Sequence, residues 1–152
     1  MNIVYKKKEN KMKFIKSTEM KIDLKPDQEK NLSTKSDIIL IIKENPETVL
    51  AFDIYDKDNL IGFVLVREYE KQKYFLWEYA IDIKYQNCHK GTKAIIEFID
   101  YMKNSYNAIE FTTTYLYGNE HAKHIYEKVG FIETSVIDED DCHEVNMIYH
   151  VK

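Results

Sequence analysis

A polar segment in the middle of the chain has residue types that bind anions. Residues 81–92 read Ile-Asp-Ile-Lys-Tyr-Gln-Asn-Cys-His-Lys-Gly-Thr, and an apolar stripe at helical spacing follows. The start of a helix presents backbone N–H groups without intrahelical acceptors and the positive end of the helix dipole. With Lys90 and Lys93 in place, this turn suits a pyrophosphate. The alternative is an ordinary strand-to-helix turn with solvated lysines.

A second segment, residues 119–131, predicts a helix with clear ends. Asn119 is a typical N-cap, and Gly130 is the residue type that commonly follows a helix. Tyr126 lies on the apolar side of this helix, so composition alone makes it a core aromatic. His121 and His124 are three residues apart on the same helix, but no third ligand stands at a diagnostic spacing. The sequence therefore predicts no metal site.

Together, the two segments resemble the GNAT superfamily of acyl-CoA-dependent N-acetyltransferases. The family's phosphate-binding pattern, Gln/Arg-x-x-Gly-x-Gly/Ala, is matched by Gln86 and Gly91. Its later pattern, Asn-x-x-Ala-x-x-x-Tyr-x-x-x-Gly-Phe, is matched by Asn119, Ala122, Tyr126, Gly130 and Phe131. The motifs occur in the right order, each after a predicted strand, and residues 60–63 (Leu-Ile-Gly-Phe) lie where the family often has such a run. The resemblance covers residues 49–152 well and the first third loosely.

One position departs from the family pattern. His89 stands where the first glycine of the phosphate-binding motif is expected. A side chain there can crowd the approach of a phosphate to the backbone, because glycine is used where a ligand must come close. Alternatively, the imidazole can donate a hydrogen bond to a phosphate oxygen.

The resemblance implies acetyl-CoA as co-substrate and a set of site residues. Those implied to bind acetyl-CoA are Ile81, Asp82, Ile83, Gln86, Asn87, Cys88, His89, Lys90, Gly91, Thr92, Asn119 and Tyr126. Tyr126 corresponds to the family's acid, which protonates the departing thiolate. Glu78 corresponds to a catalytic carboxylate that takes the proton of the acceptor amine, which is needed because an alkylammonium has a pKa of about 10. The alternative for Glu78 is a satisfied carboxylate on a strand.

The acceptor implied by the resemblance is a primary amine. Residues 24–32 followed by Ser36, and residues 112–120, are similar to bacterial spermine/spermidine acetyltransferases, which favours a polyamine or diamine. The rivals are a protein or peptide acetyltransferase, an antibiotic-modifying one, and a degenerate non-catalytic CoA-binding module. The acidic run 138–141 either attracts a polycation or is a solvated hairpin tip. A homodimer is expected from the family alone.

The elements that must position these residues follow from periodicity. Residues 49–55 and 60–66, joined by four polar residues, predict an antiparallel hairpin. In a third strand over 75–83, strict alternation predicts that Glu78 lies on the face opposite the aromatic residues Phe75, Trp77 and Tyr79. Helices are predicted after Gly91, over 119–130 and near Ile38, capped by Ser36 or Asp37. Further strands are expected at 2–5, 109–115, 131–136 and 145–151. The order predicts an α+β (mixed α/β) domain, and the GNAT resemblance implies a mostly antiparallel sheet of six or seven strands with helices on both faces.

Composition limits the classes of protein to which this chain can belong. A chain of 152 residues and 18.2 kDa, with 44% hydrophobic and 32% charged residues, predicts one globular domain over residues 1–152. The net charge of -4 argues against nucleic acid or an anionic membrane as the main partner. The longest aliphatic run, 38–42, is too short to span a bilayer, and the two cysteines make no disulfide framework. We therefore expect a cytoplasmic protein; that it acts on a small-molecule amine is implied by the resemblance alone.

Overall fold

The computed structural model describes residues 11–86 and 88–152, so the strand expected at 2–5 lies outside the described residues. The elements follow in the order β1 (Lys13–Lys16), α1 (Pro26–Glu29), α2 (Lys35–Glu44), β2 (Val49–Asp56), β3 (Asn59–Glu70), β4 (Lys73–Ile81), a 3₁₀ turn (Ile83–Tyr85), α3 (Lys90–Tyr106), β5 (Glu110–Leu116), α4 (Glu120–Val129), β6 (Ile132–Glu139) and β7 (Cys142–His150). Every helix and strand predicted within the described residues is present. Their boundaries differ by a few residues.

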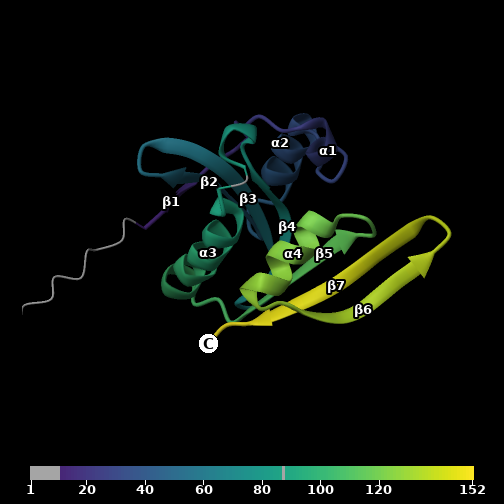
Figure 1. Cartoon of the computed structure of the whole chain (residues 1–152). Coiled ribbons are helices and arrows are strands. Elements are labelled where there is room, and N and C mark those ends of the chain that lie inside the picture. Colours follow the sequence, from purple (N-terminus) through teal and green to yellow (C-terminus); the bar gives the residue numbers. More distant parts are fainter. Residues whose placement is uncertain (1–10, 87) are drawn as a thin grey trace, which may run out of the picture.

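Within the described residues, the strands form one seven-stranded sheet in the order β1-β2-β3-β4-β5-β7-β6. All neighbours are antiparallel except β4 and β5, which are parallel because α3 connects them. The β6–β7 hairpin extends beyond the rest of the sheet (Figure 1). A mixed α/β fold with a mostly antiparallel sheet is thus confirmed.

Two hydrophobic cores cover the two faces of the sheet. On one face, Ile95, Phe98 and Met102 of α3 pack with strand residues such as Phe52 and Phe111, and α4 lies beside α3 (Figure 1). On the other face, Ile38 of α2 packs with a smaller set that includes Phe63 and Leu65. Helices therefore cover both faces, as expected.

The start of α2 differs from the prediction. Its N-cap is Thr34, whose Oγ1 accepts a hydrogen bond from the Asp37 backbone N–H at 3.1 Å, so the helix begins before the expected caps Ser36 and Asp37. Several adjacent residues can cap a helix, and only the backbone conformation decides between them. Among the described helices, none has the length and apolar character of a membrane span.

A β-bulge in β4 decides which residues face the functional site. Val66 of β3 pairs with Leu76 and Leu65 pairs with Glu78, so Trp77 has no partner on β3. The bulge reverses the alternation: Leu76 before it and Ile81 after it belong to the same core. The prediction that all the aromatic residues of this strand lie opposite Glu78 is therefore wrong. Phe75 points to the same side as Glu78, whereas Tyr79 points to the other.

Candidate active site

The site begins where two parallel strands separate. Residues Lys73–Leu76 of β4 pair with Glu110–Thr113 of β5, after which β4 and β5 continue without pairing to each other. At the last pair, the Thr113 hydroxyl donates to the Leu76 carbonyl at 3.1 Å. A cleft of about 570 Å³ opens beyond this point, a volume that suits a small-molecule site.

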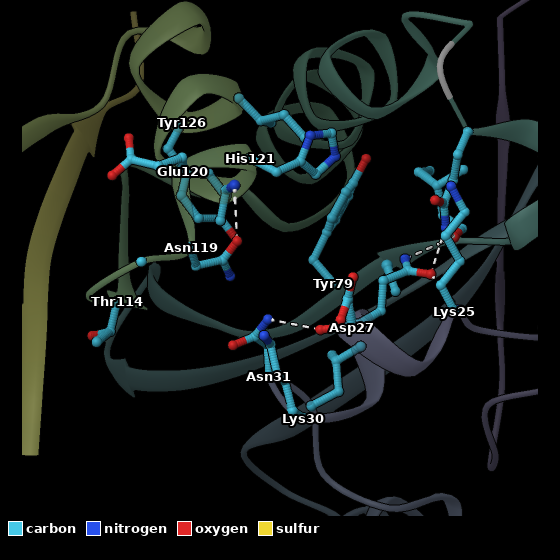
Figure 2. A pocket seen from close by; sticks show the side chains of 18 of the residues that line it. Lys25, Asp27, Lys30, Asn31, Tyr79, Thr114, Asn119, Glu120, His121 and Tyr126 are labelled. Carbon is cyan, nitrogen blue, oxygen red and sulfur yellow. Dashed lines mark hydrogen bonds between the residues drawn. The ribbon is translucent and has the colours of Figure 1, made fainter.

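Two walls and a strand enclose the cleft. Figure 2 shows α4 and the loop before it on one side, with Asn119, Glu120, His121 and Tyr126. Lys25, Asp27, Lys30 and Asn31, in and around α1, lie on the opposite side, and Tyr79 of β4 lies between the walls. Both charge signs therefore line the cleft.

The edge of β4 inside the cleft carries backbone groups that β3 does not use. The Asp82 N–H donates to Ile61 of β3 at 2.7 Å, so by alternation the peptide groups of Tyr79 and Ile81 face the split. The Ile81 carbonyl accepts from two side-chain amides, Gln86 Nε2 at 3.0 Å and Gln28 Nε2 at 3.2 Å. This edge can pair with an extended ligand that itself contains amide groups.

Two residues predicted to bind acetyl-CoA are engaged within the protein. The Asp82 carboxylate accepts from the backbone N–H groups of Asp23 at 3.0 Å and Lys84 at 2.8 Å. The Ile83 N–H donates to the Asp23 carbonyl at 2.9 Å. These bonds tie the segment before α1 to the 3₁₀ turn, and so they shape the turn that precedes α3.

The first turn of α3 has the open donors that the sequence predicts. The Lys93 N–H donates to the His89 carbonyl at 3.3 Å, which leaves the N–H groups of Lys90, Gly91 and Thr92 at the open end of the helix. His89 is the N-cap, with φ of 57°, the left-handed conformation that glycine adopts without strain. That backbone angle explains why a glycine suits this position.

The second motif glycine permits close packing. A Cβ on Gly91 would lie 3.2 Å from Cδ1 of Ile125 on α4. The Tyr79 hydroxyl donates to the Gly91 carbonyl at 2.6 Å, which holds α3 against β4. Gly91 therefore lets the start of α3 approach both α4 and β4.

The lysines of this turn already have acidic neighbours. Lys90 Nζ forms an ion pair with Asp56 at the end of β2, and this pair lowers the pKa of the Asp56 carboxyl. Lys93 lies 4.0 Å from Glu97. Cys88 is exposed, and Asn87 lies outside the described residues. The Asp56 contact was not foreseen, because it joins residues from distant parts of the sequence.

Tyr126 lies in the cleft with a proton that it retains at neutral pH. Burial raises the pKa of its hydroxyl, the Thr113 hydroxyl opposes the shift, and the charge of Glu78 adds to it. The Tyr126 ring also packs against Phe131, with 5.5 Å between centroids. Asn119 lines the same wall, and its Oδ1 caps α4 by accepting from the Ala122 N–H at 3.2 Å.

Glu78 is a buried carboxylate with 3% of its surface exposed. Burial raises its pKa, and hydrogen bonds from Ser33 oppose that shift. The carboxyl does not line the cleft, although its neighbours Trp77 and Tyr79 do. Sequence reasoning did not identify Ser33, Gln28 or Trp77 as residues of the site. Trp77 is the one tryptophan of the chain, and this was a usable signal for it.

The histidines form no metal site in the described part of the chain. His121 lines the cleft, whereas His143 lies on β7, where Asp138 approaches it to 2.6 Å. No group of three potential His, Cys, Asp or Glu ligands occurs among residues 11–86 and 88–152.

Solved structures share this fold at low sequence identity. A spermidine N-acetyltransferase from Vibrio cholerae, in complex with CoA and spermine, has a TM-score of 0.64 at 19% identity, over 78% of this chain and 76% of that one. A Bacillus subtilis acetyltransferase in complex with CoA has a TM-score of 0.64 at 15% identity, over 92% and 100%. The ribosomal-protein-S5-alanine acetyltransferase from Vibrio fischeri has a TM-score of 0.61 at 16% identity, over 76% and 69%. At these identities the likeness establishes the fold.

The family follows from the sequence itself. No curated protein matches the chain significantly. The sequence pattern described as "Acetyltransferase (GNAT) family", however, matches residues 13–131, which include the strand split and both motifs. The chain therefore belongs to the GNAT acetyltransferase family, as an acyl-CoA-dependent N-acetyltransferase with acetyl-CoA as its co-substrate.

Proposed function

We propose that this cleft transfers an acetyl group from acetyl-CoA to a primary amine by direct attack, with both substrates bound together. The observation that carries the proposal is the arrangement of two titratable side chains about the strand split. The Tyr126 hydroxyl lies in the cleft, and the Glu78 carboxyl lies behind its β4 wall. The negative charge of Glu78 adds to the effect of burial and helps to raise the pKa of the Tyr126 hydroxyl.

The proposed acetyl-CoA site runs along β4 to the start of α3. The backbone groups of Tyr79 and the N–H of Ile81, which face the split, would pair with the amide-bearing arm, and the open N–H groups of residues 90–92 would receive the pyrophosphate. Gln86, Asn119 and Tyr126 would line the arm, since they line the cleft. Cys88 and His89 flank the pyrophosphate turn, whereas Asp82 and Ile83 would act through the shape of that turn.

Glu78 and Tyr126 are the proposed base and acid. Acetyl-CoA supplies a thioester carbonyl that a neutral amine can attack. A carboxylate whose pKa is raised by burial is a better base than an exposed one, which favours Glu78 as acceptor of the ammonium proton. A tyrosine whose pKa is raised stays protonated at neutral pH, so Tyr126 can donate to the departing thiolate.

The proposed acceptor is a polyamine or diamine such as spermidine. Asp27 and Glu120 bring carboxylates to opposite walls of the cleft, and ammonium groups of a polyamine pair with such charges. A spermidine N-acetyltransferase is among the structures that share the fold. Lys25 and Lys30 line the same cleft and would repel the ammonium groups of the acceptor, so these groups would lie beside the carboxylates instead.

An amine panel tests this assignment. The protein is incubated with acetyl-CoA and spermidine, spermine, cadaverine, an aminoglycoside, or a peptide with a free N-terminus, and products are identified by mass spectrometry. Acetylated spermidine or cadaverine at the highest kcat/KM is expected. Preferred acetylation of the peptide or the aminoglycoside would move the acceptor class to proteins or antibiotics. Binding of acetyl-CoA without any product would indicate a non-catalytic CoA-binding module.

We further propose a cytoplasmic homo-oligomer. Cys88 and Cys142 are free, which fits a reducing compartment. One related spermidine N-acetyltransferase from Vibrio cholerae is described as dodecameric. Cell fractionation and light scattering after size-exclusion chromatography measure both properties, and a monomeric mass would contradict the second.

A further inference from the structure

A substrate in the cleft cannot contact Glu78, the proposed base, directly. Glu78 is 3% exposed and does not line the cleft, although the residues on either side of it do. The β4 bulge at Trp77 turns Glu78 to the face that α2 covers, away from Tyr79. A proton that leaves an amine in the cleft therefore needs an intermediate group to reach this carboxylate.

Ser33 is the residue that connects to Glu78. Its hydroxyl donates to Glu78 Oε1, and its backbone N–H lies 3.3 Å from both carboxylate oxygens. Ser33 is half-buried and so more accessible than Glu78; it does not itself line the cleft, but it directly follows Leu32, which does. The hydrogen bonds that Glu78 accepts within the described residues all come from this one serine.

The two donors of Ser33 have different chemical capacities. A backbone N–H can only stabilise the negative charge, whereas a hydroxyl can accept one proton while it donates another. The loop between α1 and α2 thus places a group able to transfer protons against the buried base and directly after Leu32, a residue of the cleft wall.

We propose that Ser33 is a proton relay from the acceptor ammonium to Glu78. The ammonium N–H proton passes to Ser33 Oγ as the original hydroxyl proton passes to Glu78 Oε1. The serine remains neutral, the carboxylate becomes a carboxylic acid, and the amine gains the lone pair that attacks the thioester. This inference rests on the proposed function, since it takes Glu78 as the base.

The pH profile separates a relay from a simple influence on Glu78. Removal of the hydroxyl also removes a hydrogen bond that opposes the raised pKa of Glu78. A change of that pKa alone would move the midpoint of the kcat profile to higher pH and leave the plateau in place. Loss of a relay would lower the plateau itself, where Glu78 is fully ionised.

The experiment compares Ser33→Ala, Ser33→Thr, Thr34→Ala and Glu78→Gln with the parent protein between pH 6 and 9. Ser33→Ala keeps the backbone N–H bonds to Glu78. Thr34→Ala, the matched control, removes the N-cap of α2 from the same loop without touching Glu78. Quenching of Trp77 fluorescence measures acetyl-CoA affinity, and thermal unfolding is measured for each variant.

We expect Ser33→Ala to lower the kcat plateau by about tenfold or more, within the range of acid–base contributions. Ser33→Thr should restore most of that loss, and the kcat plateau of Thr34→Ala should stay within about twofold of that of the parent. The double variant Ser33→Ala, Glu78→Gln should be no slower than Glu78→Gln alone, because the two groups act in series.

Three outcomes would overturn the relay. They are a Ser33→Ala plateau equal to that of the parent, a loss in Thr34→Ala as large as in Ser33→Ala, and additive losses in the double variant. Unchanged activity of Glu78→Gln at every pH would instead reject Glu78 as the base, and the relay with it. A protein with no amine acetylation at all would reject the proposed function before Ser33 is considered.

Discussion

Replacing Tyr126 with phenylalanine tests the acid of the proposed reaction. The hydroxyl lies beside Thr113, and the Thr113 hydroxyl keeps its bond to Leu76 when Tyr126 is changed, so no buried donor loses its acceptor. The ring keeps its contact with Phe131. The free energy of unfolding should therefore change by only about 1 kcal/mol.

The kinetic effect should be larger than the effect on stability. Loss of a positioned proton donor costs about a hundredfold in kcat, which equals about 2.7 kcal/mol of barrier at 1.36 kcal/mol per tenfold. Only the transition state loses this interaction, so acetyl-CoA affinity should stay near that of the parent.

The assay is single-turnover release of the CoA thiol at saturating acceptor, which isolates the chemical step. Tyr79→Phe is the matched control, because it removes a second cleft hydroxyl whose bond goes to the Gly91 carbonyl. Its effect should fall mainly on acetyl-CoA affinity. A single-turnover rate for Tyr126→Phe equal to the parent rate would refute the assignment, as would an equal loss in both variants.

Four further predictions follow from the same geometry. Millimolar acetyl-CoA should raise the melting temperature in a thermal scan, because it binds the folded state alone; an unchanged scan would count against the site. His89→Gly should relieve a left-handed backbone that costs a non-glycine residue about 1 kcal/mol, and a smaller acetyl-CoA dissociation constant in calorimetry would show that the imidazole obstructs. Gly62→Ala should lower the free energy of unfolding by about 1–3 kcal/mol in urea titration, because the new Cβ would lie 2.8 Å from the Ala80 carbonyl oxygen; parent-like stability would mean that the sheet yields there. Changing Asp138, Asp140 and Asp141 to asparagine should alter the KM for spermidine by less than about twofold at 0.1 M salt, since the run lies at the hairpin tip and does not line the cleft; a large increase that disappears at 1 M salt would support electrostatic attraction.

Local signals were enough to predict much of this protein. Asn119 and Gly130 mark the two ends of α4 as expected, because capping depends on neighbouring backbone groups. The apolar stripe after Gly91 gives α3 its buried face. Gln86 and Tyr126, chosen by motif, both reach the cleft.

Contacts between segments distant in the sequence could not be predicted from the sequence. Gln28 and Gln86 meet on the Ile81 carbonyl although they are 58 residues apart, and Lys90 pairs with Asp56 across 34 residues. Such pairs depend on how the turns are placed by the folded sheet, and a single sequence contains no local pattern for them. Lys90 was therefore expected near a phosphate, whereas its ion pair with Asp56 was not expected.

The bulge at Trp77 shows how one residue changes the chemistry that a sequence can predict. Strict alternation correctly separates Glu78 from Tyr79, but it does not reveal that Leu76 and Ile81 share a core. Because β4 stops pairing with β5 one residue before the bulge, the same short stretch opens the cleft and turns Glu78 to the face of the sheet that α2 covers. Burial raises the pKa of this carboxyl, which suits the proposed base, but it also keeps the carboxyl from the cleft, and the proposed Ser33 relay would resolve this conflict.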